Sequence, residues 1–186
     1  MKKLILLLLI PILSVGQIIK EGSRQIHLDF HTSGLIENIG ENFSKEQFKK
    51  ALKIGNVNSI NIFGKGHHGY SYYNTKIGTR HPHLKFDLLK EQIEACHEMG
   101  VTAQVYFTVG WSQKDADDHP EWILKDKNGT TNKLEILKKL GPNDRLPNFT
   151  WRLLAPSNGY DEFILKQVEE ICVNYDIDGF WFDILQ

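Results

Sequence analysis

The sequence predicts an α/β fold, and more closely the N-terminal half of a (β/α)8 TIM barrel with about four β/α units. Segments with the period of strands alternate along the chain with segments with the period of helices, which is typical of a parallel sheet. Polar residues recur on one face of the expected strands, whereas strands covered by helices on both faces should be apolar throughout. A barrel explains this pattern, because its outer face meets helices and its inner face rises to a polar mouth. An open doubly wound sheet is the less favoured alternative.

Strands are expected where apolar and polar residues alternate. In the first strand, Ile26 and Leu28 would face one side of the sheet, and His27 and Asp29 the other. The same alternation recurs three more times. The four strands are predicted at residues 24–32, 59–64, 102–109 and 179–184.

Helices are expected in the connections between these strands, at residues 44–56, 87–99 and 160–175. Ser44 can cap the first helix, with Gln47 placed to complete a capping box. Gly100 is suited to end the second helix. The stretch 113–159 is long for a connection and is expected to form a wall or lid, with Trp122 and Trp151 suited to lining a subsite. The alternative is a surface excursion capped by these tryptophans. A short helix is expected at 133–140.

The N-terminus has the pattern of a secretory signal peptide, predicted at residues 1–16. Lys2 and Lys3 precede an aliphatic run from Leu4 to Leu13, and Gly16 offers a small residue for cleavage. The run is too short to cross a bilayer, which takes roughly 20 apolar residues. We expect a secreted or periplasmic protein, with a linker at residues 17–23 and one domain at 24–186.

Charge and length limit the function further. Lys and Arg together number 22 against 23 Asp and Glu, a net charge of −1, so no basic surplus points to nucleic acid or an anionic membrane. A whole barrel needs about 250 residues, so the chain is expected to be the N-terminal part of a longer enzyme. The alternative is a natural half-barrel that dimerises. The two cysteines are expected to be buried thiols.

Asp183 is the strongest candidate for a catalytic residue, because it ends the aromatic strand Phe180-Trp-Phe-Asp183. A lone buried carboxylate is costly, and period two turns Trp181 and Asp183 towards the barrel axis. Retaining glycosidases use one carboxylate as nucleophile and a second, about 5–5.5 Å away, as acid/base. The alternative is a structural carboxylate. Asp178, at the opposite end of this strand, is interpreted as part of a turn.

His67 and His68 follow the second strand between glycines, and neutral imidazoles can both donate and accept hydrogen bonds with sugar hydroxyls. Gly64-x-Gly66-x-x-Gly69 also spells a dinucleotide-binding fingerprint. That interpretation requires a helix to begin there, and the following residues have no helical period. An exposed turn or a satisfied pair of core histidines is the structural alternative.

The run His27-x-Asp29-x-His31 supports a rival hypothesis, a metal-dependent hydrolase with ligands on its first strand. A three-ligand site would need further donors on later strands, where aromatic, amide and hydroxyl side chains predominate. No metal and no cofactor are therefore predicted. His31 is expected to contact sugar, and Trp111, after the third strand, to line the same site.

In this order, the motifs resemble the α-L-fucosidase clan of retaining glycoside hydrolases, and more closely the group called hypothetical glycosyl hydrolase 6. The resemblance covers residues 24–186. Its motifs are a His-x-Asp-Phe-His-Thr strand, His-His-Gly-x-Ser-Tyr-Tyr, Arg-His-Pro-x-Leu and a closing Asp-Gly-Phe-x-Phe-Asp, beginning at His27, His67, Arg80 and Asp178.

This resemblance implies that Asp183 is the nucleophile, that Trp181 is its aromatic neighbour, and that His31, His67 and His68 bind sugar. The clan's acid/base lies beyond the nucleophile strand, so the chain alone is expected to be an inactive fragment. The expected partner is an oligosaccharide, with no nucleic acid and no membrane. The resemblance leaves open a homo-oligomer formed through C-terminal domains. A metal-dependent hydrolase of the amidohydrolase type and a sugar-binding pseudoenzyme remain as alternatives.

Overall fold

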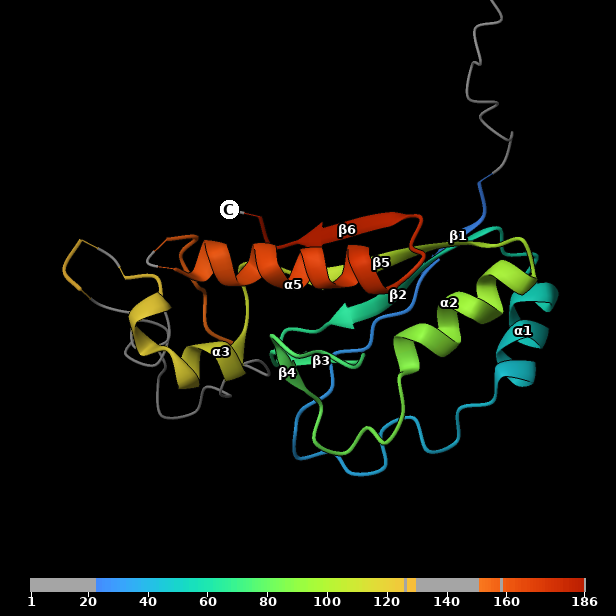
Figure 1. Cartoon of the computed structure of the whole chain (residues 1–186), viewed down its shortest axis with the longest axis horizontal. Coiled ribbons are helices and arrows are strands. Elements are labelled where there is room, and N and C mark those ends of the chain that lie inside the picture. Colours follow the sequence, from blue (N-terminus) through green and yellow to red (C-terminus); the bar gives the residue numbers. More distant parts are fainter. Residues whose placement is uncertain (1–22, 126, 130–150, 158, 186) are drawn as a thin grey trace, which may run out of the picture.

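The structure, a computed structural model, describes residues 23–125, 127–129, 151–157 and 159–185 (Figure 1). The expected signal peptide at 1–16, the linker at 17–23 except Ser23, and the expected helix at 133–140 lie outside the described residues. No helix in the described part of the chain is long and apolar enough to span a membrane.

Four parallel strands lie side by side in the order of the chain (Figure 1). They are β1 (Gln25–His27), β2 (Ser59–Lys65), β5 (Thr102–Thr108) and β6 (Gly179–Asp183). The connections between them contain α1 (Lys45–Ile54), α2 (Leu88–Glu98) and α5 (Tyr160–Asn174). The predicted α/β fold with a parallel sheet is thereby confirmed.

The three helices pack on the outer face of the sheet, where period-two alternation gathers the apolar side chains. Leu52 of α1, Leu89 of α2 and Ile171 of α5 belong to one buried cluster with Ile60 of β2 and Val105 of β5. Two predicted caps are confirmed. Ser44 accepts a hydrogen bond from the Gln47 amide (3.3 Å), and Gly100 follows α2 with a left-handed φ of 66°.

The opposite face of the sheet, called the inner face below, has its own aromatic cluster. Phe63 and Tyr106 stack at 4.1 Å between ring centroids, and Tyr72 packs with them. Tyr72 precedes α2 and reaches this face through a short hairpin that the sequence did not predict. In the hairpin, β3 (Tyr70–Ser71) pairs antiparallel with the end of β2, and β4 (Thr79–Arg80) pairs with β3.

The prediction of a first strand at 24–32 was wrong in its second half, because β1 ends at His27. Beyond this point the Tyr72 hydroxyl takes the place of a neighbouring strand. It donates to the Phe30 carbonyl (2.7 Å) and accepts from the Thr32 amide (3.0 Å). A side chain 40 residues away thus satisfies backbone groups that a longer ladder would have used.

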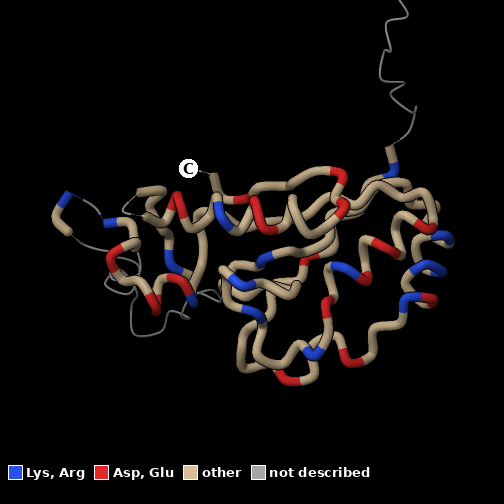
Figure 2. The backbone as a smooth tube through the Cα atoms, viewed as in Figure 1, with Lys and Arg blue, Asp and Glu red and all other residues tan. Residues whose placement is uncertain are grey.

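Two further features differ from the sequence prediction. The long connection after β5 begins with a short helix, α3 (Gln113–Asp118), followed by a 3-10 turn at Pro120–Trp122. Cys96 is buried as expected, but Cys172 is exposed on α5. Lys45 of α1 pairs with Glu94 and Glu98 of α2, which joins the two helices on the surface. Figure 2 shows positively and negatively charged positions interspersed along both helices.

Candidate active site

The carboxyl ends of the parallel strands bring three of the expected residues together. Asp183 ends β6, His67 lies in the turn after β2, and His31 follows β1. Tyr106, from β5, lies between them. In the sheet register Asp183 is opposite Thr108, and Trp181 is opposite Tyr106. Asp183 and Trp181 therefore share the inner face, as period two predicts.

The Asp183 carboxylate is held by one hydrogen bond at each oxygen. The Tyr106 hydroxyl donates to Oδ2 (2.6 Å), and the Ile184 amide donates to Oδ1 (2.9 Å). The side chain remains 36% exposed, so the carboxylate is oriented yet accessible. Burial and the bond to Asp183 raise the pKa of Tyr106, which keeps its phenol protonated as a donor.

A hydrogen-bond chain fixes the tautomer of His67. The Thr108 hydroxyl donates its single proton to the Trp111 carbonyl (2.9 Å) and so must accept from His67 Nδ1 (2.7 Å). The proton of neutral His67 therefore lies on Nδ1. Its Nε2, 3.3 Å from the Tyr106 hydroxyl and 3.7 Å from Asp183 Oδ2, is an acceptor at the nucleophile candidate.

His31 lies flat against His67, with ring centroids 3.8 Å apart and planes 13° apart. Its Nδ1 accepts from the His67 backbone amide (2.9 Å), so neutral His31 carries its proton on Nε2. That nitrogen contacts Asp29 Oδ1 at 3.0 Å. The two imidazoles thus form one stacked unit with defined tautomers.

The histidines of this unit are uncharged at neutral pH. Burial, followed by the adjacent His31, lowers the pKa of His67 to about 3. The pKa values of His31 and His68 are also lowered, chiefly by burial. Neutral imidazoles can bind hydroxyl groups without repelling or neutralising the Asp183 carboxylate.

Tryptophans close one side of this site. Trp111 and Trp151 lie 5.0 and 4.6 Å from the His67 ring, both edge-on. The His68 ring meets Trp151 at 5.5 Å. Trp181, by contrast, lies deeper on the inner face, 6.2 Å from the His27 ring and 47% exposed.

The backbone immediately after Asp183 is strained. Ile184 has a φ of 56°, a left-handed value that β-branched residues rarely adopt. A Cβ at Gly110 would lie 2.4 Å from the Ile184 carbonyl oxygen, so the close approach of the two strand ends requires glycine there. Strain of this kind concentrates at functional sites.

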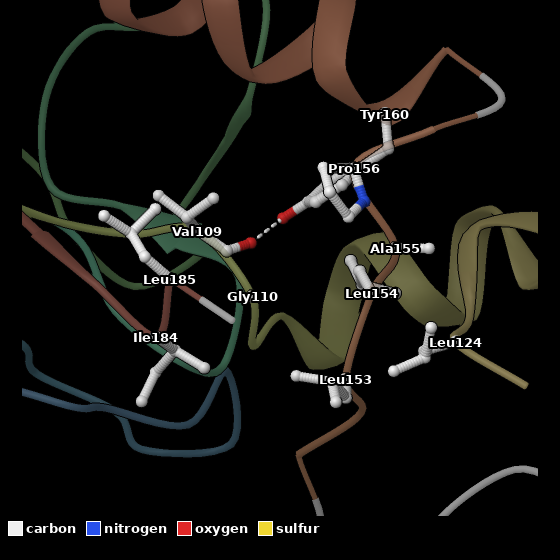
Figure 3. Close-up of a pocket in the computed structure, with 10 residues that line it drawn as sticks. All are labelled: Val109, Gly110, Leu124, Leu153, Leu154, Ala155, Pro156, Tyr160, Ile184 and Leu185. Carbon is white, nitrogen blue, oxygen red and sulfur yellow. Dashed lines mark hydrogen bonds between the residues drawn. The ribbon is translucent and has the colours of Figure 1, made fainter. Parts of the chain in front are cut away.

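An apolar pocket of about 340 Å³ lies behind the ends of β5 and β6 (Figure 3). Its lining includes Leu153, Leu154 and Leu185, and the Tyr160 hydroxyl points across it to donate to the Val109 carbonyl (2.6 Å). No carboxylate or imidazole lines it. The groups that could act in catalysis, the Asp183 carboxylate and the imidazoles of His31 and His67, therefore lie on the inner face of the sheet and not in this pocket.

The candidate metal ligands of the first strand are engaged separately. His31 contacts Asp29, while His27 Nδ1 lies 3.2 Å from the Asn61 side-chain amide. Within the described ranges, no group of three or more His, Cys, Asp or Glu side chains is arranged to hold a metal ion.

Two site residues were not singled out as ligands or orienting groups from the sequence: Tyr106 and Thr108. The alternation of apolar and polar residues in β5 placed Tyr106 and Thr108 on the polar face of the sheet. This alternation was the sequence signal that could have marked them as site residues. Their specific partners depend on the register between β5 and β6, which the sequence does not contain.

Comparison with protein families gives a match over residues 44–184 to the model described as hypothetical glycosyl hydrolase 6. Among solved structures, alpha-L-fucosidase isoenzyme 2 from Paenibacillus thiaminolyticus is 40% identical, with a TM-score of 0.78. The match covers 88% of this chain and 24% of that enzyme. No match was found among curated proteins.

Two other solved structures share the fold at low identity. An alpha-fucosidase from Thermotoga maritima is 21% identical, with a TM-score of 0.52, and the match covers 78% of this chain and 29% of that one. A maltogenic alpha-amylase from Thermotoga neapolitana is 16% identical, with a TM-score of 0.53 and coverage of 87% and 39%. The chain thus spans about a quarter of the length of the fucosidases it matches.

Proposed function

This chain belongs to the hypothetical glycosyl hydrolase 6 family, and we propose that it is the N-terminal part of a retaining glycoside hydrolase acting on α-L-fucosides. The observation that carries the proposal is the Asp183 carboxylate, oriented by Tyr106 and exposed beside the neutral Nε2 acceptor of His67. The likeness at 40% identity to an alpha-L-fucosidase supports the choice of sugar.

In the proposed reaction, one Asp183 oxygen attacks the anomeric carbon while the bond from that carbon to the leaving-group oxygen breaks. A second carboxylic acid protonates the leaving group. The same residue then takes a proton from water, which attacks the anomeric carbon and releases Asp183, so that configuration is retained. Because the chain spans 24% of the Paenibacillus thiaminolyticus fucosidase, we assign this acid/base to a part of the enzyme outside the chain. The chain alone would then be inactive.

The remaining predicted residues are assigned to sugar binding. His67 Nε2 would accept a hydrogen bond from a sugar hydroxyl, and His31 would hold the His67 ring in place through their stack. His68 would bind a neighbouring hydroxyl. Trp111 and Trp181 would offer aromatic surface to the apolar face of the ring.

The same proposal includes the barrel. Parallel strands in chain order, with helices on the outer face and polar groups on the inner one, are the pattern of a (β/α)8 barrel, whose catalytic residues lie at carboxyl strand ends. Secretion or export to the periplasm, directed by residues 1–16, is part of the proposal, as is a homo-oligomer formed through C-terminal domains.

The protein expressed from its complete reading frame is expected to hydrolyse an aryl α-L-fucoside. NMR should detect the α anomer of L-fucose as the initial product, before the two anomers equilibrate. An aryl β-galactoside and an aryl α-glucoside serve as comparison substrates. Release of the β anomer first would contradict the retaining mechanism. Turnover of a comparison substrate but not of the fucoside would contradict the choice of sugar.

Replacing Tyr106 with phenylalanine is expected to lower kcat/KM by about 10- to 100-fold, because a hydrogen bond to a charged group contributes about 1.5–3 kcal/mol. Tyr175→Phe is the matched control. Its hydroxyl also donates to a carboxylate, Asp87 Oδ2 at 2.6 Å, but it lies at the amino end of the sheet. Equal kcat/KM for the two variants would show that Tyr106 does not act through Asp183.

A further inference from the structure

A buried ion pair lies directly beneath the turn that carries His67 and His68. Lys65 Nζ contacts Asp115 Oδ2 at 2.5 Å, and the two side chains are 1% and 4% exposed. The Ser112 hydroxyl donates to the same carboxylate oxygen (2.7 Å). The ammonium group also lies 5.4 Å from the Phe107 ring and 5.5 Å from the Phe163 ring.

A bulge in β2 points Lys65 away from the active site. The register between β2 and β5 shifts between Phe63 and Lys65, so that Phe63 is opposite Tyr106 and Lys65 is opposite Phe107. Phe63 therefore faces inwards with Tyr106, while Lys65 faces the helices with Phe107. Lys65 is two residues from His67 yet belongs to the opposite face of the sheet.

The partner, Asp115, lies in the first turn of α3, and this same turn holds the histidine backbone. The Gln113 amide donates to the His67 carbonyl, and the Lys114 amide donates to the His68 carbonyl, both at 3.1 Å. These amides have no partner within the helix, so the turn satisfies them. The ion pair therefore joins the strand before the turn to the helix that binds the turn.

The end of the histidine turn, at Gly69, also packs closely against the start of α3. Gly69 has a φ of 85°, and a Cβ there would lie 2.4 Å from the Ser112 hydroxyl. The turn and the start of α3 are thus in direct contact. A small rotation of α3 would move both histidine carbonyls together.

Stability alone does not account for a pair of this kind. Removing two charges from water costs free energy that their attraction seldom exceeds, and apolar residues of similar volume are often as stable. A short charged contact does, however, define a direction and a distance, which an apolar contact does not. We propose that Lys65 and Asp115 are positioning residues that fix α3 against β2 and thereby set the place of the His67 and His68 rings. The consequence for sugar binding rests on the proposed function.

The test is the double variant Lys65→Met/Asp115→Leu, which removes both charges and preserves volume. It is expected to fold, with a Tm close to that of the wild type. Imidazole NMR signals followed against pH, assigned with a His67→Gln variant, report the environment of His67. The wild-type His67 pKa lies near 3. In the double variant we expect it to rise by at least about one unit towards 6.5, because a displaced ring admits water.

Asp118→Asn is the matched control. It also removes a charge from α3, but from the surface pair with Lys114, and it should leave the His67 pKa unchanged. If the double variant does not fold, Lys65→Met/Asp115→Asn, which also removes both charges and keeps the shape at Asp115, is expected to shift the pKa in the same direction. An unchanged His67 pKa in a folded variant would overturn the proposal.

Titration with L-fucose separates this inference from the proposed function. The double variant is expected to bind fucose at least about tenfold more weakly than the wild type and the Asp118→Asn control. Absence of fucose binding by the wild type would count against the proposed function, while the His67 pKa would still decide the positioning role. A raised pKa with unchanged fucose affinity would contradict the consequence for binding.

Discussion

Replacing Asp183 with alanine is expected to reduce kcat/KM for an aryl α-L-fucoside by at least about 10³-fold in the protein expressed from its complete reading frame. The variant removes the atom that would bond to the anomeric carbon, and no other group replaces it. The neighbouring hydrogen-bond donors, Tyr106 and the Ile184 amide, would then face a cavity. The measurement is the initial rate over a range of substrate concentrations.

Asp178→Asn is the control for this loss. Asp178 precedes the same strand at its amino end, where it accepts from the Ala103 amide (2.7 Å) and contacts His97 Nε2 (2.9 Å). Its replacement should lower the Tm while leaving kcat/KM within a few-fold of wild type below that temperature. A comparable loss of activity in both variants would indicate damage to the fold rather than loss of a nucleophile.

Acidification is expected to destabilise the chain strongly before its carboxylates titrate. In the folded state burial holds the pKa of His67 at about 3, against an ordinary value of 6.5 for histidine. Between these values the unfolded chain binds a proton at His67 and the folded chain does not, so protons favour unfolding. The stabilisation is present above pH 6.5 and is lost as the pH falls towards 3.

The expected size follows from about 1.4 kcal/mol for each unit of pKa. His67 alone should remove about 2 kcal/mol of the free energy of unfolding between pH 6.5 and pH 4.5, since the unfolded histidine is already half protonated at pH 6.5. The lowered pKa values of His31, His68 and His81 act in the same direction. Urea unfolding at these two pH values measures the effect.

A His67→Gln variant should show a clearly smaller pH dependence over the same range. An unfolding free energy that is constant from pH 6.5 to pH 4.5 in the wild type would contradict the buried, neutral state of His67. It would also remove the basis for a neutral Nε2 acceptor beside Asp183.

Local signals predicted the elements of this fold well. Ser44 begins α1 and Gly100 follows α2 because capping is decided by residues within one turn of the helix end. The alternation of the last strand placed Asp183 at its carboxyl end and on the inner face, where the structure also has it. These features need no knowledge of distant partners.

Features that depend on distant partners were not predictable from the sequence. The first strand stops at His27 because the Tyr72 side chain supplies hydrogen bonds to residues 30 and 32. Lys65 points outwards because β2 bulges at Gly64, and a glycine in a strand only hints at a bulge. The tautomer of His67 is fixed by Thr108, 41 residues later.

Covalent trapping tests the central claim, that Asp183 is the nucleophile, most directly. The protein from the complete reading frame would be incubated with a 2-fluorinated α-L-fucosyl fluoride, digested and analysed by mass spectrometry. The proposal predicts that the fluorofucosyl group is found on the peptide that contains Asp183 and is absent from the Asp183→Ala variant. A label on another carboxylate, in an enzyme that turns over fucosides, would contradict it.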